Sequence, residues 1–168
     1  MPTPDVDVQK MLEALLRHKE SFVVIGGFAA ELHDVPIPPT RNIDITPATD
    51  PDNLNRLIAA LNELDARLRV PAGPAEGVIV PGGLTPEFLQ SMISVALVTK
   101  AGPLDISLLP DGTHGYPDLE RGSLQMAFQR LQIPVASLDD IIRSKEAAGR
   151  EKDLLVLPAL REHRRRQG

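Results

Sequence analysis

A short apolar segment that ends in two glycines is the feature that most constrains the fold of this chain. Residues 21–25 read Ser-Phe-Val-Val-Ile, and Gly26 and Gly27 follow directly. A brief run of β-branched and aromatic residues predicts a buried strand. The next six residues, Phe-Ala-Ala-Glu-Leu-His, predict a helix, so the glycines lie at a strand-to-helix turn. Glycines there allow a phosphate to approach the amides at the helix start, although many such turns use glycine for geometry alone.

Further helices and strands alternate along the 168 residues. Apolar spacing predicts helices over about 6–19, 51–68, 85–92, 137–149 and 151–166, with a kink or break at Pro158. Strands are predicted over 42–47 and 78–80, as a hairpin over 93–110, and as one or two strands over 122–136. Residues 34–39, with three prolines, and residues 111–118 are predicted loops. This order predicts a single mixed α/β (α+β) domain over 1–168, with a core at about 20–110 and a helical part at about 135–166.

The composition is that of an ordinary soluble domain. Hydrophobic residues make up 42% of the chain and charged residues 24%. The longest apolar run, residues 22–30, is about half the length that a membrane-spanning helix needs. The first ten residues lack the basic and apolar regions of a signal peptide, and the absence of cysteine excludes disulfides and thiolate sites. We expect a cytoplasmic protein with no membrane partner.

Positive charge is concentrated near the carboxyl terminus. The net charge of −5 argues weakly against a surface that binds nucleic acid throughout. The last eight residues nevertheless contain four arginines, and Arg143, Lys145, Arg150 and Lys152 lie shortly before them. Such cations suit the negative end of a helix dipole, and they also suit a surface that contacts phosphate or RNA. Both interpretations remain open from the sequence.

Two polar residues in the predicted strand 42–47 suggest a metal site. Asn42 and Asp44 are two residues apart, so they project from the same face of the strand while Ile43 and Ile45 enter the core. Adjacent oxygen-bearing side chains on a rigid strand suit Mg²⁺. A solvent-facing sheet surface would give the same alternation. Asp105, between Leu104 and Ile106, would complete the cluster if its strand lies beside this one.

These segments together resemble the nucleotidyltransferase superfamily of the DNA polymerase β type. The resemblance rests on VVIGGFAAELH, on TRNIDIT about fifteen residues later, and on LDISLL as a third acidic strand. The ending SLDDIIRSKEAAGREKDLLVLPAL is similar to that of the bacterial branch that includes the AbiEii and MenT toxins. The resemblance covers about residues 21–160 and implies a small mixed β-sheet flanked by helices, with closing helices at the carboxyl end.

The resemblance also implies roles for residues on the sheet. Gly26 and Gly27 would hold the triphosphate of an NTP, with Thr40 beside the metal strand. In this superfamily divalent metal aligns a nucleophile with the α-phosphate and stabilises the pyrophosphate leaving group. The implied ligands of Mg²⁺ or Mn²⁺ are Asn42, Asp44 and Asp105.

On the closing helices, the resemblance implies three further site residues. Lys145 would contact the triphosphate as a compact point charge, and Lys152 would assist it in binding nucleotide. Asp153 would orient Lys152, Lys145 or the nucleotide. Judged by their positions alone, Lys145 could equally be a solvated lysine and Lys152-Asp153 could serve only the start of a helix.

Asn42 departs from the pattern of the family, which has aspartate at this position. Asparagine retains one metal-binding carbonyl but removes a negative charge, so a site with one carboxylate fewer should hold divalent ions more weakly. Either the protein is naturally impaired or altered in its chemistry, or the residue is an introduced replacement that inactivates a toxic enzyme. The otherwise intact set of residues favours the second explanation.

The resemblance predicts an NTP-dependent nucleotidyltransferase toxin that modifies RNA, foremost the 3′ end of tRNA, and that has a cognate antitoxin protein. A protein acceptor is an alternative. Asn42 favours another alternative, a catalytically inactive protein that binds nucleotide or a partner. A small-molecule transferase of the aminoglycoside type ranks lower, because we expect it to need a larger acceptor domain than the helices after Ile133.

Overall fold

The computed structural model describes residues 7–167. The predicted domain extends over 1–168, and its first six residues, among them Val6 at the predicted start of the first helix, lie outside the described part. No helix among the described residues is long and apolar enough to cross a membrane.

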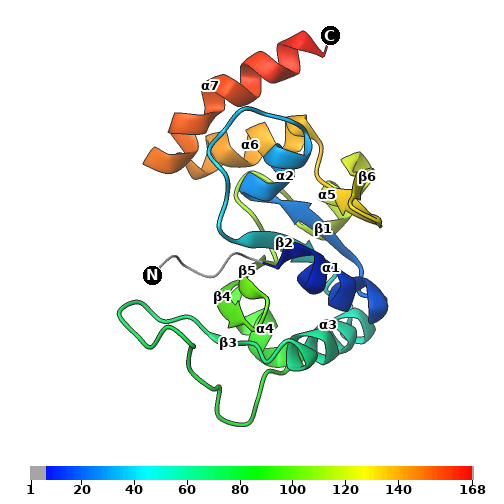
Figure 1. The fold of residues 1–168 in the computed structure, drawn as a ribbon, viewed down its shortest axis with the longest axis vertical. Helices are drawn as coiled ribbons and strands as arrows, with labels where there is room; N and C mark the ends of the chain where they lie inside the picture. The colour runs from blue at the N-terminus through cyan, green and yellow to red at the C-terminus, as the bar shows by residue number, and fades with distance from the viewer. Residues whose placement is uncertain (1–6, 168) are drawn as a thin grey trace.

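The core is a mixed seven-stranded sheet with the strand order β3-β4-β5-β2-β1-β7-β6 (Figure 1). β1 is antiparallel to β2 and parallel to β7, and β2 is parallel to β5. β4–β5 and β6–β7 are antiparallel hairpins, and β3 pairs antiparallel with β4 at one edge. The strands are β1 Phe22–Ile25, β2 Ile43–Pro47, β3 Arg67–Leu68, β4 Ser94–Thr99, β5 Gly102–Ser107, β6 Leu124–Phe128 and β7 Leu131–Val135.

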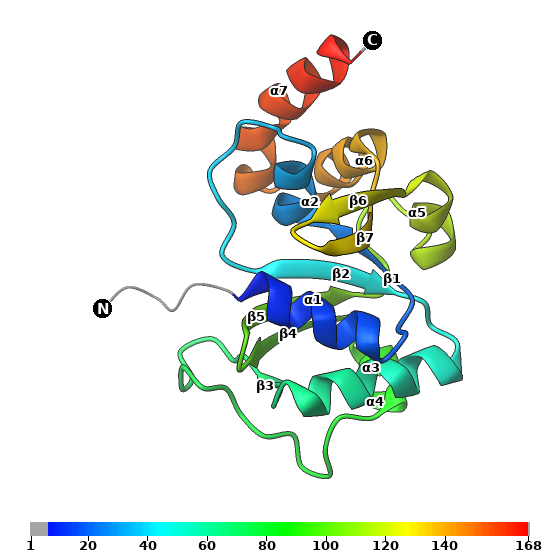
Figure 2. The same cartoon turned by 45° about the vertical axis from the view of Figure 1, so that its right-hand side comes forward.

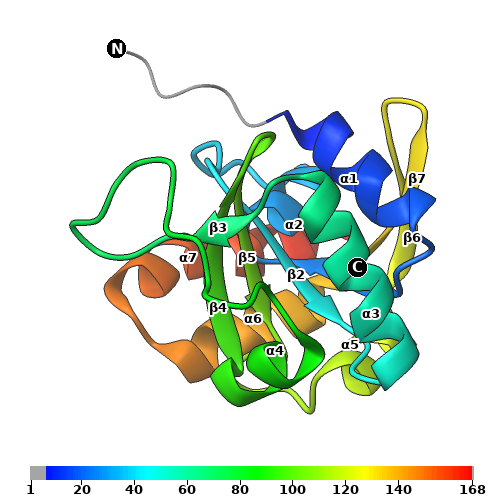
Figure 3. The same ribbon diagram turned by 90° about the horizontal axis from the view of Figure 1, so that it is seen from below.

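Helices pack on both faces of this sheet. Figures 2 and 3 show α1 and α3 next to each other in front of it, and α6 and α7 on the other side. In Figure 1, α7 and the long loop after β3 lie at opposite ends of the molecule. The helices are α1 Val8–Arg17, α2 Gly26–Leu32, α3 Pro51–Glu63, α4 Pro86–Met92, α5 Tyr116–Gly122, α6 Leu138–Ala148 and α7 Glu151–Arg166.

The helix boundaries that rest on capping residues are confirmed. Side chains of Asp50, Thr85 and Ser137 accept backbone N–H bonds at the starts of α3, α4 and α6. Gly149 ends α6 in a left-handed conformation with φ of 62°. These local signals are strong because they satisfy backbone groups that a helix end otherwise leaves unpaired.

Three predicted elements were wrong. The helix predicted to Leu68 ends at Glu63, because the chain turns at Asp65 (φ 53°) and then pairs as β3 with β4. Residues 78–80 form only an isolated bridge from Val78 to Leu68. The predicted loop 111–118 instead leads into α5, whose first turn contains a proline and whose Leu119 is buried. The helix predicted over 151–166 is confirmed as α7, which contains Pro158 without a break.

A buried polar cluster joins α3 to the turn between α1 and β1. Asn53 is fully buried; its Oδ1 accepts the backbone N–H of Ser21, and its Nδ2 lies 3.0 Å from Oε1 of Glu20. The other carboxylate oxygen of Glu20 has no hydrogen-bond partner. Burial raises the pKa of Glu20 to about 8, although Asn53 and Arg56 act in the opposite direction. The folded protein therefore holds a proton here that the unfolded chain releases at neutral pH.

We predict that this proton makes stability depend on pH. Because the folded pKa of Glu20, about 8, exceeds its ordinary value of 4.5, stability is fully present below pH 4.5 and falls as pH rises to 8. Glu20→Gln should remove this dependence. The free energy of unfolding of the variant, relative to that of the unmodified chain, should therefore be higher at pH 8.5 than at pH 5 by about 1 kcal/mol or more. Urea unfolding at both values measures this difference. Glu76→Gln, in an exposed loop, is the matched control, and equal behaviour of the two variants would contradict the assignment.

Candidate active site

The two predicted carboxylates lie opposite each other in the centre of the sheet. Parallel pairing of β2 with β5 makes Asp44 and Asp105 direct neighbours across the strands. Alternation along each strand places their side chains on the same face, while Ile43, Ile45 and the residues flanking Asp105 are buried. The condition set by the sequence, that the strand of Asp105 lies beside that of Asp44, is met.

Asn42, just before β2, links both carboxylates through its amide. Its Nδ2 donates to Oδ2 of Asp105 at 2.6 Å and to Oδ1 of Asp44 at 3.3 Å. On its other side, the hydroxyl of Thr40 lies 3.4 Å from Oδ1 of Asn42 and donates to its backbone carbonyl at 3.1 Å. The predicted neighbours Thr40, Asn42, Asp44 and Asp105 therefore form one cluster. Asn42 faces the carboxylates as a hydrogen-bond donor, not with the carbonyl that would bind a metal.

Arg69 is a member of this cluster that the sequence did not reveal. Its Nη2 donates to Oδ1 of Asp105 at 3.0 Å, in an ion pair at the surface of the site. Arg69 directly follows β3, which the sequence analysis assigned to the end of a helix. A two-residue edge strand has no periodicity that could have identified it, so no clear signal in the sequence pointed to Arg69.

The environment of Asp44 favours its protonated form. Burial, and then the negative charge of Asp105, raise the pKa of Asp44 from 3.8 to about 7. The charges of Lys145 and Lys152 act in the opposite direction but do not offset the increase. Two carboxylates this close repel each other, and a cation between them would relieve the repulsion.

Gly26 and Gly27 form the turn from β1 into α2 and lie against this cluster. Gly26 has a φ of +71°, and a Cβ atom there would lie 2.6 Å from Oδ2 of Asp44. A Cβ at Gly27 would lie 3.2 Å from Cβ of Thr40. Gly26 thus allows a close approach of α2 to β2, and Gly27 allows one to the loop before β2, which is a structural requirement whether or not a phosphate binds.

A cleft of about 990 Å³ opens over the cluster. One wall is the sheet, with Asn42, Asp44 and Asp105; the other consists of α6 and the start of α7. All the predicted site residues line it: Gly26, Gly27, Thr40, Asn42, Asp44, Asp105, Lys145, Lys152 and Asp153. The cleft places cations of the closing helices opposite the carboxylates of the sheet.

Asp153 lies within ion-pair distance of Lys145, one of the three partners that the sequence analysis named for it. This carboxylate is 1% exposed, lies 3.3 Å from Nζ of Lys145 and 2.8 Å from Nε of Arg150. Burial alone would raise the pKa of Asp153, but the hydrogen bond from Arg150 and the two positive charges outweigh it and lower the pKa. The structure pairs Asp153 with Lys145 and Arg150, and Lys152 lines the cleft separately.

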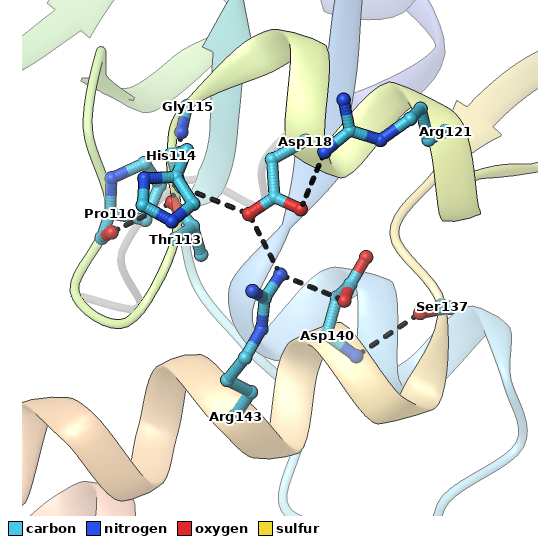
Figure 4. Close-up of polar contacts among 9 residues, drawn as sticks. All are labelled: Pro110, Thr113, His114, Gly115, Asp118, Arg121, Ser137, Asp140 and Arg143. Atoms are coloured by element: carbon cyan, nitrogen blue, oxygen red, sulfur yellow. Dashed lines mark hydrogen bonds and ion pairs between the residues drawn. The ribbon is translucent and has the colours of Figure 1, made fainter.

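A second ion-pair cluster fixes α6 against α5 (Figure 4). Asp118 of α5 accepts the backbone N–H of His114 at 2.9 Å and a hydrogen bond from Arg143 at 3.0 Å. Arg143 also contacts Asp140 at 2.9 Å, and the N–H of Asp140 bonds to Ser137. The hydrogen bond from His114, and then that from Arg143, lower the pKa of Asp118. This cluster holds the helix that carries Lys145.

The arginines at the end of α7 are engaged in ion pairs. Arg161 contacts Glu146, Arg164 contacts Asp139, and Arg165 and Arg166 both contact Glu162. These side chains are partly exposed, so each pair contributes little to stability. The pairs do lower the free positive charge of the surface that the sequence offered as a contact for RNA.

The residues present fit one divalent ion. Asp44 and Asp105 are adjacent oxygen ligands whose mutual repulsion a cation would relieve. Within residues 7–167, no three His, Asp or Glu side chains are grouped so that they could hold a metal. The donor set is therefore weaker than a site of three carboxylates.

We predict that Gly26→Ala disrupts the site and destabilises the fold. A Cβ atom would collide with Asp44, and an alanine is strained at φ of +71°, so the free energy of unfolding should fall by about 1–3 kcal/mol. Chemical denaturation measures the loss. Gly27→Ala is the matched control: its backbone is not at positive φ and its closest contact, at 3.2 Å, is milder. An equal loss in both variants would contradict the role assigned to Gly26.

Comparison with solved structures relates this arrangement to known proteins. LnuA, a lincosamide antibiotic adenylyltransferase with lincomycin bound, matches with a TM-score of 0.58 and 17% identity, over 92% of this chain and 94% of LnuA. The antibiotic-resistance factor ANT(2″)-Ia matches with a TM-score of 0.58 and 14% identity, over 96% of this chain and 83% of its own. A nucleotidyltransferase-type protein from Thermotoga maritima matches with a TM-score of 0.56 and 20% identity, over 90% and 88%.

Neither a protein-family model nor a curated protein sequence matches this chain. The likeness to these structures spans nearly the whole of it, and the mixed sheet with its flanking helices is common to them. At such low identities the likeness establishes architecture and not substrate. The chain therefore has the fold of the nucleotidyltransferases.

Proposed function

We propose that this protein transfers a nucleotidyl group from an NTP to an acceptor hydroxyl. The observation that carries the proposal is the pairing of Asp44 with Asp105 in the floor of a cleft whose opposite wall bears Lys145 and Lys152. Carboxylates on one side and lysines on the other suit a metal-bound triphosphate, because they contact the cation and the phosphates respectively.

Each residue then has a defined task. Asp44 and Asp105 hold Mg²⁺ or Mn²⁺, which when bound polarises the α-phosphate and neutralises the pyrophosphate that leaves. Lys145, held by Asp153, contacts the triphosphate, and Lys152 adds a second charge from the same wall. Gly26 and Gly27 keep the turn free of side chains where the nucleotide approaches. An NTP substrate also fits the cytoplasmic location that we propose.

One candidate acceptor is RNA, foremost the 3′ end of tRNA. It is supported by the resemblance of residues 21–160 to the toxin branch and by the arginines of α7. In that case the protein is a toxin and has a cognate antitoxin. The ion pairs of Arg161, Arg164, Arg165 and Arg166 weigh against this acceptor, since they occupy the cations that would contact phosphates.

A small hydroxyl compound is the second candidate, and the rim of the cleft favours it. Ile93, Leu109 and Leu155 come from three different parts of the fold, line the cleft and are 54%, 54% and 74% exposed. Apolar side chains gathered at a polar site suit the body of a small organic acceptor better than an RNA backbone. LnuA, an adenylyltransferase of a small antibiotic, is matched over 94% of its length, so chain size does not argue against this acceptor.

Product formation tests the proposal. The chain and its Asn42→Asp variant are incubated with each labelled NTP and Mg²⁺ or Mn²⁺, together with total tRNA or with a panel of hydroxyl-bearing antibiotics. We expect pyrophosphate release that depends on one of these acceptors, and faster release by Asn42→Asp because a third carboxylate strengthens the metal site. Label in RNA selects the first acceptor, and label in a small product selects the second.

Nucleotide that binds without any pyrophosphate release, in both proteins, would favour the catalytically inactive nucleotide-binding protein. Absence of binding as well as release would refute the proposed function. Intact-mass measurement of the protein in the same reaction detects self-modification and so tests a protein acceptor.

We predict that Lys145→Met weakens NTP binding about tenfold or more, through loss of a charge that faces the triphosphate. Calorimetric titration with a non-hydrolysable NTP measures the change. Lys10→Met is the matched control, because Lys10 is an exposed lysine on α1, which lies outside the cleft. Asp153 keeps its contact with Arg150 in the variant, and thermal melting checks that the fold is retained. Equal affinities of the two variants would remove Lys145 from the site.

A further inference from the structure

Both carboxylate oxygens of Asp105 accept a hydrogen bond. Oδ1 accepts from the guanidinium of Arg69 at 3.0 Å, and Oδ2 accepts from the amide of Asn42 at 2.6 Å. The same amide lies farther from Asp44, at 3.3 Å from its Oδ1. The two carboxylates are therefore unequal, because Asp105 is paired with a permanent cation and accepts the shorter hydrogen bond from Asn42.

The position of Arg69 follows from the register of the sheet. Its backbone N–H bonds to the carbonyl of Ala96 at 2.9 Å, and Ala96 is the direct partner of Asp105 in the β4–β5 hairpin. Directly paired residues of antiparallel strands have side chains on the same face. The guanidinium thus reaches Asp105 past Ala96, which has the smallest side chain among the β4 residues that line the cleft. The contact is a product of backbone pairing and not of a chance surface encounter.

With Arg69 included, the net charge of this site equals that of a site with three carboxylates and two divalent ions. Three carboxylates and two divalent ions carry a net charge of +1 before nucleotide binds, the arrangement of a two-metal site. Here Asn42 is neutral, so two carboxylates, the guanidinium of Arg69 and one divalent ion also carry +1. An arginine has a permanent charge and binds carboxylate and phosphate with defined geometry, so it suits the place of a cation.

We propose that Arg69 stands in for one of two metal ions, occupying Asp105 as a built-in cation and leaving the site with a single divalent ion. Arg69 competes with metal for Asp105. Asparagine at position 42 gives the site one negative charge fewer than three carboxylates would, and the positive charge of Arg69 in place of a second metal ion balances this difference. The inference rests on the proposed function for its purpose, but it concerns metal binding by the protein without nucleotide.

Manganese binding without nucleotide tests the proposal at fixed pH 7.5. The paramagnetic resonance signal of free Mn²⁺ reports its affinity and stoichiometry. The unmodified chain should bind one ion, and Arg69→Gln should bind Mn²⁺ about tenfold more tightly, because Asp105 is released from its competitor. Arg67→Gln removes the same charge from the preceding strand β3, outside the cleft, and should leave the affinity unchanged.

A double-mutant cycle separates competition at Asp105 from a general effect of charge. In the Asp105→Asn background, Arg69→Gln should no longer tighten Mn²⁺ binding, because the carboxylate for which metal and arginine compete is gone. A similar gain in both backgrounds, binding of two ions by the unmodified chain, or no gain on Arg69→Gln would each overturn the proposal. Thermal melting of each variant confirms that it is folded.

Because these measurements contain no nucleotide, their failure would leave the proposed transfer reaction intact. Absence of NTP binding would in turn refute that reaction without affecting the Mn²⁺ result.

Discussion

Parallel pairing of β2 with β5 is the constraint on which the site depends. It makes Asp44 and Asp105 direct neighbours across the strands, although they are far apart along the chain. The pairing needs β4 and β5 as a hairpin on one side and β1 on the other, so the site lies in the middle of the sheet. Buried neighbours such as Ile43, Ile45 and Leu104 hold this register, since a slip of one residue would turn them to the surface.

The electrostatics of the site follow from placing two carboxylates this close. Burial, and then repulsion by Asp105, raises the pKa of Asp44 to about 7, while the charges of Lys145 and Lys152 act to lower it. Asn42 donates a hydrogen bond to each of the two carboxylates, and Arg69 places a full positive charge beside Asp105. Arg69 and Asn42 thus contact different oxygens of the same carboxylate, Asp105.

Ion pairs hold together the second wall of the cleft, which α6 and the start of α7 form. α6 carries Lys145 and is held to α5 by the ion pair of Asp118 with Arg143, and α7 supplies the buried Asp153 that pairs with the lysine. Removing one partner of a buried ion pair leaves the other uncompensated, so these contacts keep α6 and α7 in a fixed relation. The nucleotidyltransferase fold of the chain thus presents two charged walls, while the rim at Ile93, Leu109 and Leu155 is apolar.

Local chemistry in the sequence determined a large part of this protein. Alternation placed Asn42 and Asp44 on one face, capping residues marked the starts of α3, α4 and α6, and the glycine pair marked the turn after β1. Each of these signals acts within a few residues. Only the tertiary structure decided that Asp105 lies beside Asp44, that Arg69 reaches it past Ala96, and that Asp153 pairs with Lys145. These contacts arise from strand pairing and helix packing between distant segments, which periodicity cannot reveal.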